Sequence, residues 1–321
     1  MVLFLYYYSM CKWKFFLTAM AALLFFWGCG SPQQRAPAQD SRIVVLSTIA
    51  QIGDLAAYIG GDRIRHQVLV RGELNPHSYE LVKGDDEKFQ EADVVFYQGL
   101  GLEHSASVTA YVKEHPNALA VGDAIFARVP DQILWKDSVV DPHVWMDLAL
   151  WSEAIDPIAE RLSAIDPAGA AGFRARADAL KAQMQTVHQQ MRKQLQHIPP
   201  EKRYLVTSHD AFHYFARSYL AIPEERDWEE RFTAPEGLAP DGQLNPIDLK
   251  NIVDHLAKYR IEVIFPESNV SRDSIRKIAD AGKHLGLRVR ICEEVLYGDA
   301  LQGSYLEAMQ HNADVIARGL S

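Results

Sequence analysis

Three histidines and one aspartate occupy turn positions far apart along this chain. They lie in the segments NPHSYE, DPHVWMD, TSHDAF and LYGDAL, as His77, His143, His209 and Asp299. Imidazole nitrogens and a carboxylate together suit a first-row divalent cation such as Zn²⁺. A proline precedes His77 and His143 and fixes the backbone there, which lowers the cost of ordering a site. A single histidine is more commonly a hydrogen-bonded core residue than a ligand, so the prediction requires the fold to bring all four together.

Several neighbouring side chains have alternative interpretations. Glu267, in FPES, follows a strand-like run and is predicted either to orient a ligand or to act as a substitute ligand. His213 lies four residues after one of the candidate ligands, and we interpret it as structural. Asp210 is predicted to cap the helix that follows it. Trp145 and Tyr79 are predicted to shield the cation from water, which would strengthen its electrostatic attraction.

Alternating strands and helices divide the chain into two halves. Buried strands are predicted at 43–49, 93–99 and 118–123, and again at 203–208, 263–268 and 287–292. Polar, helix-like stretches follow them, including 246–260, 273–286 and the segment SYLEAMQHNADVIARGL. This alternation is typical of parallel sheets covered by helices. The carboxyl ends of parallel strands form the edge where ligands bind, so the four residues are expected to meet in a cleft between two lobes.

One long helix is predicted between the two halves. From Pro167 to His197 the sequence is rich in Ala, Gln, Lys and Arg, and apolar residues recur at spacings of three and four. A helix of that length spans roughly 45 Å. The predicted fold is therefore α/β, with two (β/α) lobes that have parallel sheets and are joined by one long rigid backbone helix. The predicted boundaries are 42–166 for the first lobe, 167–198 for the helix and 199–321 for the second lobe.

The first residues have the pattern of an export signal. Lys12 and Lys14 precede the apolar run FFLTAMAALLFFWG, which is shorter than the roughly 20 residues of a membrane-spanning helix. We predict a signal peptide at 1–28, lipidation of Cys29 and a flexible tether at 29–41. An uncleaved membrane anchor is the alternative, and translation from Met10 would give a more conventional signal.

Composition narrows the class of protein. The chain has 321 residues, 48% of them hydrophobic, which suits a globular protein of two lobes with separate cores. Its formal net charge of −9 argues against a nucleic-acid binder, whose binding face would be rich in Lys and Arg. Of the three cysteines, Cys11 would be removed with the signal, Cys29 acylated and Cys292 buried in a strand. No disulfide is expected within the mature chain.

Five short motifs, NPHSYE, DPHVWMD, TSHDAFHYF, PESNVS and LYGDAL, occur in this order on either side of the long helix. In this respect residues 42–320 resemble the TroA-like zinc/manganese-binding lipoproteins, the solute-binding components of metal ABC importers. The resemblance implies that one metal ion, held between the lobes as the transported substrate, is bound by His77, His143, His209 and Asp299. It also implies an exported, lipid-anchored monomer that is not an enzyme and that delivers its ion to a permease with its ATPase.

The identity of the metal follows less directly. Manganese-selective relatives tend to carry Glu where this chain has His209, which favours zinc. Many zinc importers carry a long His- and acid-rich loop in the first lobe, and the stretch GLGLEHSASVTAYVK contains only His104. Zinc is therefore favoured, with manganese or iron close behind. Two other functions are kept as alternatives: a zinc-dependent hydrolase, and a haem, siderophore or adhesin module on the same scaffold.

Overall fold

The computed structural model describes residues 40–136, 138–240 and 244–321. The predicted signal peptide, Cys29 and nearly all of the predicted tether lie outside the described residues. In the described part of the chain, no helix combines the length and the hydropathy needed to cross a bilayer.

The first lobe is built on a four-stranded parallel sheet. Its strands are β1 (Ile43–Ser47), β2 (Ile64–Val68), β3 (Val94–Tyr97) and β4 (Ala118–Ala120), in the order β2-β1-β3-β4. The strands β1 and β3 pair in register, with Val45 opposite Val94. The predicted parallel sheet is confirmed.

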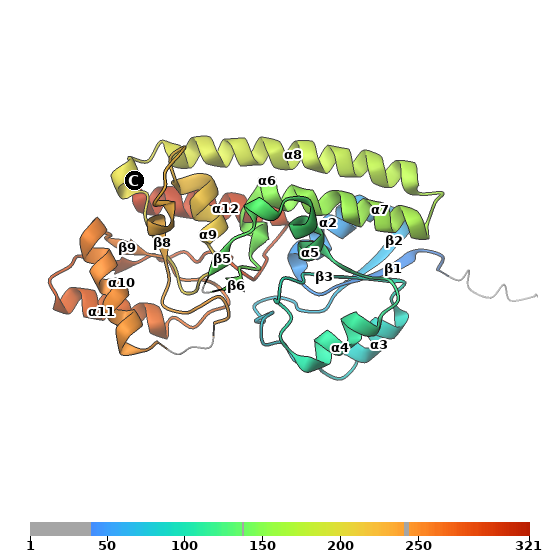
Figure 1. Cartoon of the computed structure of the whole chain (residues 1–321), viewed down its shortest axis with the longest axis horizontal. Helices are drawn as coiled ribbons and strands as arrows, with labels where there is room; N and C mark the ends of the chain where they lie inside the picture. Colours follow the sequence, from blue (N-terminus) through green and yellow to red (C-terminus); the bar gives the residue numbers. More distant parts are fainter. Residues whose placement is uncertain (1–39, 137, 241–243) are drawn as a thin grey trace, which may run out of the picture. The chain divides into compact units, whose positions relative to one another are not determined.

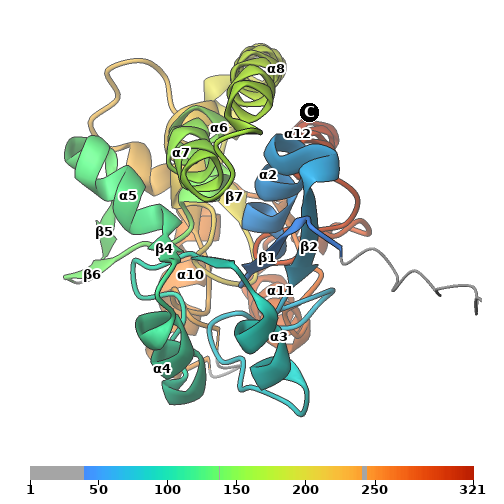
Figure 2. The ribbon, with the colours of Figure 1, turned by 90° about the vertical axis from the view of Figure 1, so that its right-hand side faces the viewer.

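Side chains alternate between the two faces of this sheet, as the strand period requires. Val45 belongs to the same buried cluster as Ile52 of α2 (Ala50–Gly60), whereas its neighbour Leu46 packs with Phe89 and Val108. These last two residues come from α3 (Asp85–Glu91) and α4 (Ala106–Glu114), on the opposite face. Figure 2 shows α2 and α7 (Ile155–Ile165) above the sheet and α3 and α4 below it. Burial on both faces explains why the central strands β1 and β3 are almost continuously apolar.

The second lobe repeats this arrangement with shorter strands. Parallel pairs form between β7 (Leu205–Val206) and β8 (Phe232–Thr233), and between β9 (Val263–Ile264) and β10 (Arg290–Ile291). A hydrogen bond of 2.8 Å from Phe265 N to Val206 O joins the two pairs. The helices α10 (Pro246–Tyr259) and α11 (Asp273–His284) cover one face. The closing helix α12 (Tyr305–Leu320) packs on the other.

The long helix is α8 (Ala170–Gln196), which spans about 40 Å at 1.5 Å per residue. It begins three residues after Pro167 and runs past both lobes in Figure 1, in contact with α7, α2 and α12. Its buried stripe, from Phe173 to Leu195, lies in a cluster that also contains Val45 of the first lobe and Phe265 of the second. Part of the core is therefore continuous across the lobes, whereas chain length suggested separate cores.

Two local expectations are wrong. The helix predicted from Asp210 begins only at His213, with α9 (His213–Phe215) followed by a π-helical turn, Ala216–Leu220. Asp210 does not cap it, because its carboxylate pairs with Lys136. Lys136 belongs to β5 (Trp135–Lys136), which forms an unpredicted hairpin with β6 (Val139–Val140).

Shorter helical segments connect these elements. Among them are α5 (Val121–Arg128), α6 (Leu148–Trp151) and the 3₁₀ turn η3 (Val144–Met146). The turn η3 follows His143 directly and leads into α6.

Candidate metal centre

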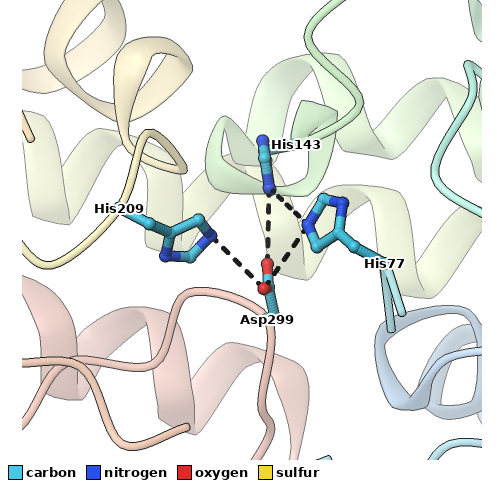
Figure 3. Close-up of side chains that lie close together, drawn as sticks. All are labelled: His77, His143, His209 and Asp299. Atoms are coloured by element: carbon cyan, nitrogen blue, oxygen red, sulfur yellow. Dashed lines mark hydrogen bonds and ion pairs between the residues drawn. The ribbon is translucent and has the colours of Figure 1, made fainter. Parts of the chain in front are cut away.

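The four candidate ligands converge at one point between the lobes. Each offers one donor atom, and these atoms all lie within 4.8 Å of one another. The four side chains are His77, His143, His209 and Asp299, and Figure 3 shows them pointing inward from four separate segments. None of the four residues is more than 5% exposed. The structure thus brings together the four residues that the sequence singled out.

Asp299 lies at the centre of the cluster. Its Oδ2 is 3.5 Å from His77 Nε2 and 3.3 Å from His209 Nε2, and its Oδ1 is 3.4 Å from His143 Nε2. The Nε2 atoms of His77 and His143 are 3.2 Å apart. All three imidazoles thus present the same ring nitrogen to one shared carboxylate.

His143 is held by a carboxylate that sequence reasoning left without a role. Asp141 Oδ1 accepts the backbone N–H of His143 at 3.0 Å and lies 2.7 Å from its Nδ1. The backbone of this turn is held as well. The Tyr214 hydroxyl donates to the Asp141 carbonyl, and the Gln98 side-chain amide donates to the Pro142 carbonyl. A carboxylate on the far nitrogen fixes the tautomer of a ligand histidine and raises its basicity. The available signal was the acid two residues before the histidine, in DPH.

His209 has the same kind of support from Glu267. Glu267 Oε1 accepts the backbone N–H groups of Ser208 and His209, and its Oε2 is 2.7 Å from His209 Nδ1. Glu267 therefore contacts the ring nitrogen that faces away from the cluster. Its predicted orienting role fits this position, and it is not among the four converging ligands.

His77 is supported differently. Asn75 Oδ1 accepts the backbone N–H of His77 at 2.9 Å, which repeats the turn at Asp141. The Nδ1 of His77 is buried without a hydrogen-bond partner in the described structure. His77 lies in the loop between β2 and α3, where the structure has neither helix nor strand.

These surroundings shift the pKa values of the four groups in different directions. Burial lowers the pKa of His77, against the opposing effect of Asp299. Burial also acts to lower the pKa of His143, but the Asp141 and Asp299 carboxylates outweigh it and raise that pKa to about 9. Burial is likewise outweighed at His209, where Glu267 and Asp299 raise the pKa well above its usual value. Desolvation disfavours the Asp299 carboxylate, but His209 and His77 hold its pKa well below the usual range.

The aromatic and histidine neighbours only partly follow the sequence-based predictions. Trp145 contacts His143 edge-on, with ring centroids 5.2 Å apart, as expected of a shielding residue. Tyr79 does not shield the cluster; its hydroxyl donates to Asp85, and its ring packs against the α3–α4 core. His213 contacts the ring of Phe232, which fits a structural role. The exposed His104, to which no role was assigned, stacks on His77 with ring centroids 6.1 Å apart.

The donor set fits a transition-metal cation. Two of the buried donor atoms, His209 Nε2 and Asp299 Oδ1, have no hydrogen-bond partner in the described structure. Buried polar atoms in folded proteins are almost always partnered, and a cation would satisfy both atoms at once. Three nitrogens and a carboxylate suit zinc, and they also accept iron or manganese when the carboxylate supplies a second oxygen.

The family model for the periplasmic zinc-uptake complex component A (ZnuA) matches residues 45–319. The metal-binding protein YtgA of Chlamydia pneumoniae is 36% identical over 319 residues, which cover 98% of this chain and 95% of that protein. The manganese-binding lipoprotein MntA of Bacillus subtilis is 34% identical over 315 residues, covering 94% and 98% of the two chains.

Solved structures agree with the fold. The Fe(III)-bound YtgA of Chlamydia trachomatis superposes with a TM-score of 0.84 at 34% identity, covering 87% of this chain and 98% of that one. The periplasmic zinc-binding protein TroA of Treponema pallidum gives a TM-score of 0.79 at 28% identity, covering 87% and 99%. The likeness extends over both lobes and α8.

Proposed function

This chain belongs to the family of periplasmic zinc-uptake complex component A proteins, and from that premise we propose that it is the solute-binding component of a metal ABC importer. It captures one transition-metal ion between its lobes and delivers it to a permease with its ATPase. The observation that carries this proposal is the buried convergence of three histidines and one aspartate from both lobes.

In this proposal, the ion is the transported substrate, bound by His77, His143, His209 and Asp299. Asp141 and Glu267 do not bind it; each places a carboxylate oxygen 2.7 Å from the far ring nitrogen of a ligand histidine. Ligands from both lobes make the site complete only when the lobes are together. Ion capture and lobe closure are therefore coupled, and α8 limits the motion to a small tilt because it is one continuous helix.

For the identity of the ion we propose zinc, with manganese and iron as the competing candidates. The three-nitrogen donor set supports zinc. The relatives named above include a manganese-binding protein and an Fe(III)-bound structure, so the donor set must be tested against all three. Elemental analysis of the protein purified without added metal, followed by competition among Zn²⁺, Mn²⁺ and Fe²⁺, decides the question. Finding no metal and measuring no affinity for any of the three would refute the function.

We propose further that the chain is exported and acts outside the cytoplasm as a lipid-anchored monomer. Residues 1–28 are the signal peptide, Cys29 carries the lipid and 29–41 form the tether, followed by lobes at 42–166 and 199–321 around the helix at 167–198. The lipoprotein name of one close relative supports this arrangement. Cys29→Ser should abolish incorporation of labelled fatty acid and release the protein from the membrane fraction. Unchanged labelling would show that the anchor lies elsewhere.

The hydrolase alternative is not favoured by the geometry. A catalytic zinc site keeps one coordination position open for water. Here Asp299 lies within 3.5 Å of all three imidazoles and takes the fourth position. The chain also lacks an HExxH sequence, the most familiar way to supply a general base beside zinc. Zinc-dependent turnover of ester or phosphodiester substrates would revive the alternative.

A further inference from the structure

The loop that carries Asp299 belongs to the second lobe, but side chains from the amino-terminal half of the chain hold its backbone. Gln51, in the first turn of α2, donates from Nε2 to the carbonyl of Asp299 at 2.8 Å. Trp145, in η3, donates from Nε1 to the carbonyl of Gly298 at 2.9 Å. Both donors are about 1% exposed. Two consecutive carbonyls beside one ligand are therefore bound from across the lobe boundary.

The same two elements also hold the far end of this loop. Asp54 of α2 accepts the backbone N–H of Tyr305 at 3.1 Å. The hydroxyl of Tyr305 in turn donates to the carbonyl of Trp145. The segment 298–305 is thus bonded at both ends to α2 and η3. Asp299 lies at the first of these two ends.

Trp145 connects two ligands at once. Its ring contacts His143 edge-on, while its N–H bonds to the residue next to Asp299. On the other side of the loop, a Cβ at Gly298 would lie 2.3 Å from Glu267 Oε2, the carboxylate oxygen that contacts His209. The Gly298–Asp299 peptide therefore lies close to both Trp145 and Glu267, and a side chain at position 298 would displace the Glu267 carboxylate.

Within the second lobe the Asp299 carboxylate has weaker support. Asn269 Nδ2 approaches its Oδ2 at 3.5 Å, the outer limit for a hydrogen bond. The bonds from Gln51 and Trp145 are shorter and fully buried, and buried bonds of this kind are costly to break. The second lobe holds the residue before Gly298 through two bonds between Asn312 and the backbone of Tyr297, at 2.8 and 2.9 Å. The carbonyls of Gly298 and Asp299 themselves are bonded by donors from the other lobe.

We propose that Gln51 and Trp145 are positioning residues that keep Asp299 within bonding range of the cation and so set how slowly the ion leaves. This inference rests on the proposed function and adds residues that do not touch the ion. Because both donors act across the lobe boundary, they tie retention of the ion to the closed arrangement of the lobes.

The test uses Gln51→Met and Trp145→Phe, which keep most of the side-chain volume and remove the donor. Zn²⁺ affinity is measured by competition with a chromophoric chelator, and release is measured by stopped flow. Each variant should raise the dissociation constant about tenfold, as expected for the loss of one buried hydrogen bond, with most of the change in the dissociation rate. Gln196→Met is the matched control, because Gln196 donates to the carbonyls of Tyr219 and Ala221, neither of which adjoins the cluster.

A double-mutant cycle separates positioning from general destabilisation. If Gln51 and Trp145 act through Asp299, neither variant should weaken Zn²⁺ binding further in an Asp299→Ala background. The visible spectrum of bound Co²⁺ should also change in Trp145→Phe and stay unchanged in Gln196→Met. Additive losses in the Asp299→Ala background, or equal losses in Gln196→Met, would overturn the inference.

The same variants test the ligand assignment of Asp299 and the positioning role of Gln51 and Trp145 separately. If Asp299→Ala itself leaves Zn²⁺ affinity unchanged, the ligand assignment of the proposed function fails. If Asp299→Ala weakens binding but Gln51→Met and Trp145→Phe do not, the ligand assignment stands and the positioning role is wrong. Melting of the cation-free variants checks that each one folds.

Discussion

Two corners of the first half of the chain share a sequence pattern and differ in what they do for the ligand. In Asn75-Pro76-His77 and Asp141-Pro142-His143, the side-chain oxygen of the first residue accepts the backbone N–H of the histidine two residues later. This local turn is a known property of Asn and Asp side chains. At the second corner only, the same oxygen also reaches Nδ1 of the ring.

The difference changes the state of the imidazole. With a carboxylate on Nδ1, His143 has its pKa raised to about 9, whereas burial without such a partner lowers the pKa of His77. The turn of His143 is also bonded by Tyr214 and Gln98, and the turn of His77 by the bond from Asn75 Nδ2 to the carbonyl of Pro240. The two corners therefore differ chiefly at Nδ1, which gives one ligand a raised pKa and leaves the other with a lowered pKa.

The largest expected effect is the dependence of affinity on pH. In the cation-free protein His143 and His209 have raised pKa values, so both rings are protonated between pH 5.5 and 7.5, and a cation must displace both protons. His77 has a lowered pKa, so it should contribute less to this proton count than the other two. Affinity should therefore fall as pH falls, by about a hundredfold per pH unit for two protons.

This is measured as the dissociation constant for Zn²⁺ across that pH range in a non-coordinating buffer. A slope close to zero would remove the histidines from the site. A thousandfold loss of affinity per pH unit, which corresponds to about three displaced protons, would show that His77 is protonated like the other two histidines. The two corners would then not differ in the protonation of their ligands.

Removal of each histidine sharpens the comparison. His143→Ala and His77→Ala should each weaken Zn²⁺ binding by more than about a hundredfold, because loss of a ligand exceeds the 10–100-fold cost of losing a partner behind one. The protons released per bound ion should drop by about one in His143→Ala and stay unchanged in His77→Ala. Calorimetry at saturating Zn²⁺ in buffers of different ionisation enthalpy counts them. Equal proton counts in the two variants would contradict the assigned difference.

Exchanging the first residues of the two corners has a smaller effect. Asp141→Asn keeps the acceptor for the backbone N–H but removes the charge on Nδ1, so the pKa of His143 should fall and Zn²⁺ affinity should weaken about 10–100-fold. Asn75→Asp is the reciprocal variant and should raise the pKa of His77. Ring titrations of the cation-free proteins by NMR provide the measurement. If Asp141→Asn leaves the pKa of His143 near 9, the carboxylate at position 141 is not its cause.

The features that could be predicted from the sequence are those that depend on short stretches of neighbouring residues. The period of apolar residues from Phe173 to Leu195 predicts α8, because an amphipathic stripe needs no knowledge of its partner. The ligand set was recognisable because each member follows a strand-like run or a Pro corner, and strand ends meet at one edge of a sheet. Strand lengths in the second lobe were overestimated, since an apolar run does not show where backbone pairing stops.

The missed features depend on side-chain directions or on distant pairs. Asp141 was visible in the sequence, but its contact with Nδ1 depends on how the turn orients the ring. Tyr79 was predicted to shield the ion, yet its hydroxyl bonds to Asp85 instead. The bond from Gln51 to the Asp299 carbonyl joins residues 248 positions apart, and no local pattern announces it.

The smallest expected effect concerns His104, the exposed ring stacked on His77 at 6.1 Å. Exposed substitutions away from buried networks usually change stability by no more than about 0.5 kcal/mol, which corresponds to roughly a twofold change in affinity. His104→Ala should therefore leave the Zn²⁺ dissociation constant within about twofold at pH 7.5, as measured by chelator competition beside the unaltered protein. A tenfold loss would show that His77 relies on this exposed neighbour for its position. In that case His77 would be supported by the exposed ring of His104, as His143 is supported by the buried carboxylate of Asp141. The two corners would then differ in where the supporting residue lies, and not in whether there is one.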